Sequence, residues 1–164
     1  MTQRNGLSMR WAALALLLAA LAACGRGPEV PREGATFEPA IASVGGVTVR
    51  ASVLPTSRLS ETVARRYGIA RSDATVLLLV SARRGSGAGE TSVPARVVAR
   101  VADLQGRSRA LTLRELRVGD GADALLDYVG TVEVDAPETL VFDLEVVPQG
   151  APAQRLQFTR DFFP

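Results

Sequence analysis

The chain has 164 residues, 47% of them hydrophobic, and its 19 basic residues are all arginines. Beyond residue 23 it contains no His, Lys, Met, Trp or Asn, and Cys24 is its single cysteine. These absences exclude Ser-His-Asp and Cys-His catalysis, lysine Schiff bases, zinc sites built on imidazole or thiolate, and an intramolecular disulfide.

The N-terminal segment has the layout of an export signal. Two arginines and no acid precede an unbroken apolar run from Trp11 to Ala23, which is shorter than the roughly 20 residues that span a bilayer. The run leads into Leu-Ala-Ala-Cys, which resembles the lipobox of bacterial lipoproteins, in which the cysteine thiol carries a diacylglycerol. We therefore expect residues 1–23 to be a lipoprotein signal peptide, Cys24 to be lipidated, and Gly25 to favour the outer membrane. The alternative is an ordinary signal peptide that leaves Cys24 as a free thiol.

The part of the chain after the predicted signal peptide is electrically balanced. Two arginines lie in the signal peptide, so the remaining 17 face 17 acidic residues, which argues against a nucleic-acid partner. Residues 24–43 are rich in Pro and Gly, so we expect the lipidated cysteine to be followed by a flexible tether. Residues 44–164 have a length suited to a single domain.

Most of this predicted domain alternates between apolar and polar residues, as half-buried strands do. The segments are 47–53, 76–80, 97–101, 111–113, 126–132, 140–146 and 156–162. Between the first two, Ser60, Glu61 and Gly68 mark the start and end of a short helix. The pattern predicts an all-β fold, an antiparallel immunoglobulin-like β-sandwich of about seven strands with one short helix between strands 1 and 2. A small barrel is the alternative.

Four stretches in a fixed order resemble the domain of unknown function 4426 family. They are "ARRYGIARS" (64–72), "LTLREL" (111–116) followed by Gly119-Asp120, "ETLVFDLEV" (138–146) and "FTRDFFP" (158–164). The resemblance covers roughly residues 46–164 and implies a small, exported, single-domain bacterial protein with no assigned activity or functional residue. The chain departs from the family in its predicted lipoprotein signal, and in Phe163-Pro164 where the family often has Tyr-Pro.

Two groups of residues are candidates for binding. Arg65, Arg66 and Arg71 surround Tyr67, and forked guanidinium groups suit an anionic ligand such as a lipid phosphate. The competing interpretation is structural, because arginines near a helix C-terminus favour its dipole and Tyr67 can pack inward. Phe163 points to the opposite side of the last predicted strand from Phe158 and Phe162, so with Tyr67 it is a candidate contact for a partner protein. The competing interpretation is that Phe163 is packed under a loop or the tether.

Four carboxylates offer two combinations that resemble functional sites. Asp120, Asp123 and Asp127 are close in sequence, as calcium ligands often are, but they lack the EF-hand spacing and fit a hairpin turn with solvated acids. Glu115 with Asp120 or Asp127 is a formal acid–base pair, but neighbouring arginines favour surface ion pairs. We therefore expect no enzyme, no cofactor and no bound metal.

These observations predict a non-enzymatic protein held by lipid on Cys24 at the periplasmic side of the cell envelope, at the outer membrane. Its expected partner is another envelope protein. The alternative is a module that binds anionic envelope lipid or glycan through Arg65, Arg66 and Arg71. The oligomeric state is left open.

Overall fold

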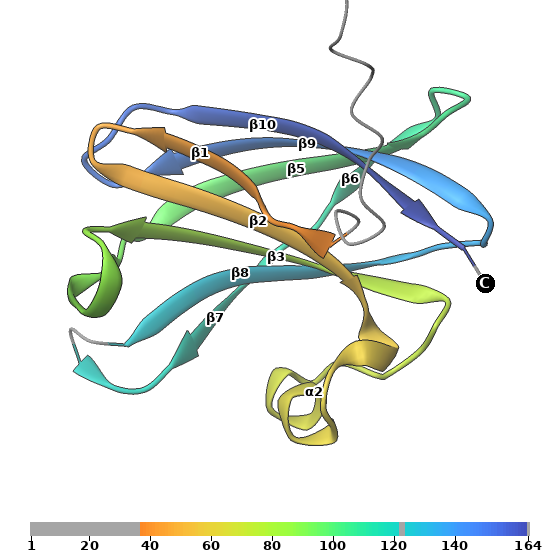
Figure 1. Ribbon diagram of the computed structural model, residues 1–164, viewed down its shortest axis with the longest axis horizontal. Helices are drawn as coiled ribbons and strands as arrows, with labels where there is room; N and C mark the ends of the chain where they lie inside the picture. Colours follow the sequence, from red (N-terminus) through yellow and green to blue (C-terminus); the bar gives the residue numbers. More distant parts are fainter. Residues whose placement is uncertain (1–36, 122–123, 164) are drawn as a thin grey trace, which may run out of the picture. The chain divides into compact units, whose positions relative to one another are not determined.

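The computed structural model describes residues 37–121 and 124–163, so Cys24 and the predicted signal peptide lie outside the described residues. The described residues form two antiparallel sheets that pack face to face, with a short helix on one of them (Figure 1). No helix in these ranges is long and apolar enough to cross a membrane.

Ten strands of the described residues make up the two sheets. Sheet A has the order β1-β2-β3-β8-β7, with β4 paired to β3, and consists of β1 (Ala40–Val44), β2 (Val47–Pro55), β3 (Thr75–Arg84), β4 (Thr91–Ser92), β7 (Arg114–Val118) and β8 (Leu125–Glu133). Sheet B has the order β10-β9-β5-β6 and consists of β5 (Ala95–Asp103), β6 (Ser108–Leu111), β9 (Glu138–Pro148) and β10 (Gln154–Phe162). The helical elements are η3 (Thr56–Arg58), α2 (Glu61–Tyr67) and η4 (Gly87–Gly89).

The core lies between the sheets because each strand presents every second residue to the opposite sheet. On β2 the inward side chains from Val47 to Val53 are at most 1% exposed, while the residues between them are partly exposed. Phe142 on β9 is fully buried and stacks on Phe158 of β10, with 5.3 Å between the ring centroids. Burial of one such side chain stabilises the fold by roughly 1.5 to 3 kcal/mol, so the alternation directs the chain into a sandwich.

The helix α2 has a capping residue at each end. Ser60 accepts a hydrogen bond from the Val63 N–H at 3.3 Å, and Gly68 ends the helix in the left-handed conformation with a φ of 60°. The apolar cluster beneath the helix consists of Leu59, Ala64, Leu77, Leu116 and Val129. The helix therefore covers part of the outer face of sheet A, which is the face directed away from sheet B (Figure 1).

On one side of the sandwich β1 of sheet A lies beside β10 of sheet B, and we call this side the closed seam. Gln154 on β10 is 3% exposed and donates from Nε2 to the Val47 carbonyl oxygen on β2 at 3.1 Å. Arg160 donates to the Glu38 carbonyl oxygen and lies 4.8 Å from the centroid of the Phe158 ring. Partial burial lowers the pKa of Arg160. Side chains from sheet B thus join the two sheets at the closed seam.

The outer face of sheet B carries exposed charges. Glu145 on β9 lies between Arg96 on β5 and Arg155 on β10, with N···O distances of 3.9 and 3.5 Å. Since all three side chains are at least 39% exposed, each ion pair contributes less than about 1 kcal/mol.

The predicted all-β sandwich is confirmed, and so is the short helix between the strands at 47–53 and 76–80, now β2 and β3. The immunoglobulin-like strand arrangement stays a prediction. Residues 40–43, expected at the end of the tether, belong to β1, so strand structure begins before the predicted boundary at residue 44. Thr91 and Ser92 add the short strand β4.

One predicted strand is wrong in a way that matters for the site. Residues 111–113 were expected to form a strand, but β6 ends at Leu111 and β7 begins at Arg114. Thr112 and Leu113 instead carry the chain from one sheet to the other, and we call these two residues the crossover.

Candidate functional site

The crossover lies on the side of the sandwich opposite the closed seam. β6 is the edge strand of sheet B, where it pairs with β5, and β7 is the edge strand of sheet A, where it pairs with β8. The chain therefore leaves the edge of one sheet and joins the edge of the other within two residues. Neither residue of the crossover belongs to a ladder.

Gly130 on β8 is the residue that allows the crossover to pass so close. A Cβ atom at this position would lie 2.6 Å from the Thr112 carbonyl oxygen and 2.7 Å from Leu113 Cδ2. Both distances are well below van der Waals contact, so any larger residue would displace the crossover. Close backbone approach thus explains why a glycine stands in the middle of a long strand.

Beyond this glycine the edge of β8 has no partner strand. The ladder with β7 ends at Val129, whereas the ladder with β3 continues to Glu133. The Val134 N–H donates toward β3, to the Ala74 carbonyl oxygen at 3.0 Å. Since backbone groups point alternately to the two sides of a strand, those of Thr131 and Glu133 point away from β3. Of the described strands, none pairs with them on that side.

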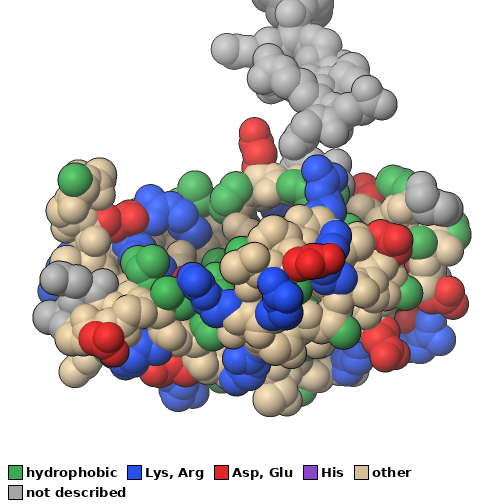
Figure 2. Space-filling view, turned by 90° about the horizontal axis from the view of Figure 1, so that it is seen from below, with side chains coloured by type: hydrophobic (Ala, Val, Ile, Leu, Met, Phe, Trp, Pro, Cys, Tyr) green, Lys and Arg blue, Asp and Glu red, His purple; other side chains and the backbone are tan. Residues whose placement is uncertain are grey.

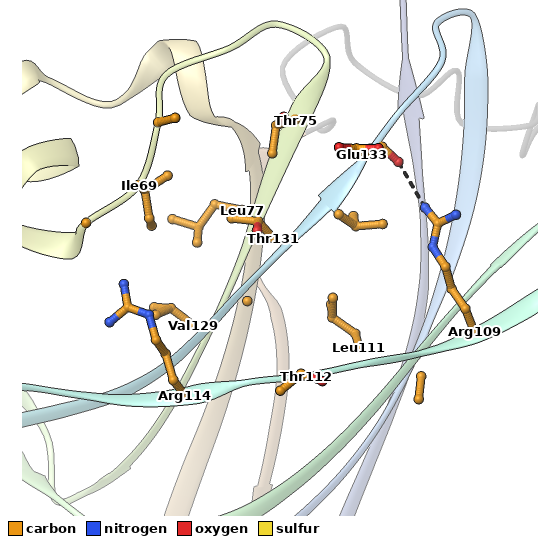
Figure 3. A pocket seen from close by; sticks show the side chains of 15 residues that line it. Ile69, Thr75, Leu77, Arg109, Leu111, Thr112, Arg114, Val129, Thr131 and Glu133 are labelled. Carbon is orange, nitrogen blue, oxygen red and sulfur yellow. Dashed lines mark hydrogen bonds between the residues drawn. The ribbon is translucent and has the colours of Figure 1, made fainter.

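A cleft of about 820 Å³ opens beside this unpaired edge. Its walls come from the segment after α2, from β3, from the end of β6 with the crossover, and from β8. The apolar part of its lining includes Ile69, Leu77, Leu111 and Val129, and three hydroxyl groups are contributed by Thr75, Thr112 and Thr131 (Figure 3). Its volume falls in the range usual for ligand sites. Seen from below, the surface has recesses in which hydrophobic side chains lie between arginines (Figure 2).

Two arginines stand toward opposite ends of the cleft (Figure 3). Arg109 on β6 donates from Nη2 to the Glu133 carbonyl oxygen at 2.9 Å, and Arg114 on β7 donates from Nη2 to the Tyr67 carbonyl oxygen. Glu133 is the one acidic residue of the lining. The cleft therefore combines a lining that is partly apolar and partly polar, unpaired backbone groups and an excess of positive charge. Such a site can hold an extended chain that carries a carboxylate.

The three arginines of the predicted cluster are all exposed but differ in their contacts. Arg65 and Arg66 are exposed in the last turn of α2. Arg71 instead donates from Nε and Nη2 to the Ser57 carbonyl oxygen, at 3.3 and 2.7 Å, and so joins the segment after α2 to η3. The side chain of Tyr67 is half-buried and packs against the apolar cluster under the helix.

Phe163 is 73% exposed at the end of the described chain, so it is not packed under a loop of the described residues. It does not line the cleft. The predicted lipidation site, Cys24, lies outside the described residues. The Phe163 side chain and the cleft are therefore separate surfaces.

The carboxylates weighed for calcium or acid–base chemistry do not form one group. Asp127 makes an ion pair with Arg83 on the outer face of sheet A. Glu115 is opposite Tyr128 on the neighbouring strand and lies 3.3 Å from Arg117, so it points to the other face of the sheet from Asp127. Within residues 37–121 and 124–163 no group of three potential metal ligands occurs, and Asp123 lies outside these ranges.

The protein is thus a small two-sheet β-sandwich with a cleft where the chain changes sheets. The chain belongs to the DUF4426 family, described as a domain of unknown function, which matches residues 41–164. The resemblance seen in the sequence is thereby confirmed.

Two solved structures are similar to the chain. A crystal structure of a DUF4426 family protein from Pseudomonas aeruginosa PAO1 is 27% identical with a TM-score of 0.60, and the match covers 77% of this chain and 95% of that one. The GAE domain of GGA2p from Saccharomyces cerevisiae is 11% identical with a TM-score of 0.32, over 77% of this chain and 96% of that one, which is too distant to support an argument. No curated protein matches the chain.

Proposed function

We propose that this protein is a non-enzymatic, lipid-anchored envelope protein that binds another envelope protein in the cleft beside β8. The anchor is the lipid expected on Cys24, and the tether that follows gives the domain its reach from the membrane. The proposal places the domain on the periplasmic side of the outer membrane. The sequence pattern Leu-Ala-Ala-Cys-Gly supports this part of it.

The observation that carries the binding role is the unpaired edge of β8 next to the cleft. Exposed strand edges either accept another strand or are protected against doing so. Here the edge at Thr131 faces a cleft of about 820 Å³ whose walls are partly apolar. A partner segment could therefore gain main-chain hydrogen bonds and bury apolar side chains at the same place.

Photo-crosslinking in living cells tests the binding role. A photoreactive residue replaces Thr131, and the matched control carries the same residue at Thr159, an exposed threonine on β10 of sheet B. We expect one discrete crosslinked protein from position 131 and none from position 159. Equal crosslinking at both positions, or none at position 131, would contradict the proposal.

The anchor is tested separately. Cys24→Ser should leave the protein uncleaved or release it from the membrane fraction, and the unchanged chain should incorporate labelled palmitate. Normal membrane retention of the variant, together with an unchanged chain free of palmitate, would reject the anchor.

The alternative role, binding of anionic lipid or glycan through Arg65, Arg66 and Arg71, is favoured by the exposure of the first two side chains. The two hydrogen bonds from Arg71 to Ser57 argue for a structural role of the third. In this case the double variant Arg65→Ala and Arg66→Ala should lose binding to anionic vesicles, and position 131 should capture no protein.

A further inference from the structure

We infer that the cleft binds an extended acidic strand of the partner protein. In the absence of that strand, the Arg109 side chain makes one of the hydrogen bonds that the strand would make. This inference rests on the proposed function and names the chemistry of the partner. Three features carry it: the direction of the backbone groups on β8, the hydrogen bond of Arg109, and the charges around the cleft.

On β8, two residues beyond the ladder with β7 have backbone groups that point away from β3 and are available to pair with an incoming strand. The outward groups are the N–H and C=O of Thr131 and of Glu133, because Val134 next to them donates toward β3. Thr131 is exposed, so its groups are accessible from the cleft. An incoming strand that pairs here would extend sheet A beyond the point where β7 leaves off.

Arg109 supplies the hydrogen-bond donor that a partner strand would otherwise supply. Its guanidinium donates to the outward carbonyl oxygen of Glu133 at 2.9 Å, which is the position that a partner N–H would occupy (Figure 3). Arg109 is itself exposed on the edge strand β6. When a strand N–H replaces it, the carbonyl keeps one donor and the guanidinium becomes free for a carboxylate.

The side chains of the cleft indicate what the incoming strand carries. Successive side chains of a strand point to opposite faces, so one residue would lie between the sheets near Leu111 and its neighbours near Ile69 and Arg114. Apolar residues suit the first environment. The second has a guanidinium, and Arg65 and Arg66 stand exposed less than one helical turn before the segment that lines the cleft. With Glu133 as the one acid of the lining, the charges favour an acidic strand over a basic one.

Binding of designed peptides to the full chain in lipid nanodiscs tests the inference. The probe is a short end-blocked peptide of alternating valine and aspartate, and its matched control has asparagine in place of each aspartate. We expect the aspartate peptide to bind about tenfold more tightly, because hydrogen bonds to charged groups are the stronger ones. Hydrogen exchange should report protection of the Thr131 amide on binding.

Single N-methylation tests strand pairing with the same probe. Because N–H groups alternate in direction, methylation at one central position should abolish binding, while methylation at the next position should leave binding unchanged. Equal effects at both positions would overturn the pairing.

The role of Arg109 is tested by Arg109→Gln, which keeps a donor for the Glu133 carbonyl oxygen but removes the charge. The variant should lose the preference for aspartate over asparagine and keep its affinity for the asparagine peptide. Arg100→Gln, at an exposed position on β5 in sheet B, is the control and should change neither. Equal affinity of both peptides for the unchanged protein would overturn the acidic preference.

The two proposals fail in different ways. If no peptide binds but position 131 captures a protein in cells, the extended acidic strand is rejected and the binding role stands. If position 131 captures nothing, the binding role itself is rejected.

Discussion

The two sides of the sandwich are completed by different means. At the closed seam β1 and β10 lie side by side, and the buried side chain of Gln154 crosses from sheet B to sheet A. At the opposite side the backbone itself changes sheets at Thr112 and Leu113 and leaves part of β8 unpaired. At the closed seam the edge strands β1 and β10 lie beside each other, whereas the edge of β8 beyond Val129 faces the cleft. The open edge is where the cleft forms.

The open edge is covered by one exposed side chain. Natural proteins commonly shield strand edges with charged side chains. Arg109 does so with a single hydrogen bond to Glu133, made by an exposed side chain. Gln154 at the closed seam is 3% exposed, so its hydrogen bond is not available for exchange with a partner. We therefore expect the hydrogen bond of Gln154 to be permanent and that of Arg109 to be exchangeable.

The largest effect is expected from Gly130→Val, at the side of the sandwich where the backbone changes sheets. The added side chain would collide with the Thr112 carbonyl oxygen and with Leu113, so the crossover must move away. We expect the free energy of unfolding to fall by about 3 kcal/mol, measured by denaturant titration.

Gly89→Ala is the control for that experiment. Gly89 has an ordinary φ, and a Cβ atom there would meet nothing within 4 Å. Its effect should be within about 0.5 kcal/mol. If the two variants were equally stable, the close approach at Gly130 would have no energetic importance.

A smaller effect is expected at the closed seam from Gln154→Glu. The substitution removes the donor to the Val47 carbonyl oxygen and places a buried carboxylate against it. At neutral pH we expect a loss of about 2 kcal/mol in the free energy of unfolding.

The pH dependence checks this explanation. Burial raises the pKa of the introduced carboxyl, and its protonated form can donate to the carbonyl again. The difference from the unchanged protein should therefore shrink as the pH falls through that raised pKa. A difference that does not depend on pH would point to a change in packing instead.

The smallest expected effect concerns the turn that leads into β6. Although burial acts to raise the pKa of Asp103, its hydrogen bonds with Arg107 outweigh burial and lower that pKa below its ordinary value. A lowered pKa in the folded protein contributes stability above the unfolded-state pKa, and this contribution is lost as the pH falls through the folded value.

Asp103→Asn should therefore lower the thermal midpoint slightly at pH 7 and not at strongly acidic pH, as thermal unfolding at the two pH values would show. Asp143→Asn, at an exposed position on β9, is the matched control. Equal shifts at both pH values would contradict the role of the charge.

Local signals in the sequence predict much of the fold. Alternation identifies the long strands such as β2 and β9, and Ser60 with Gly68 identifies the ends of α2. β1 escapes prediction because it is an edge strand on which Ile41 and Val44 are exposed, so its alternation is weak. Its pairing with β2 depends on the tertiary structure more than on its own residues.

The cleft could be predicted only in part. The sequence contains one signal, because Leu111 and Leu113 alternate in one phase while Leu116 and Val118 continue in the other, which is what a change of sheet requires. A glycine inside an apolar strand at position 130 is a second signal. Neither signal shows that the two positions meet, since they are far apart along the chain. The arginines predicted from the sequence, Arg65, Arg66 and Arg71, are therefore not among the residues that line the cleft. Arg109 and Arg114 do line it and were not predicted.

The crossover also links the two sheets during unfolding. One continuous segment, from Ser108 to Val118, supplies the edge strand of sheet B and then the edge strand of sheet A. Detachment of this edge strand from one sheet would therefore displace the edge strand of the other sheet. The described domain should unfold as a single cooperative unit, with coincident transitions for probes placed in either sheet.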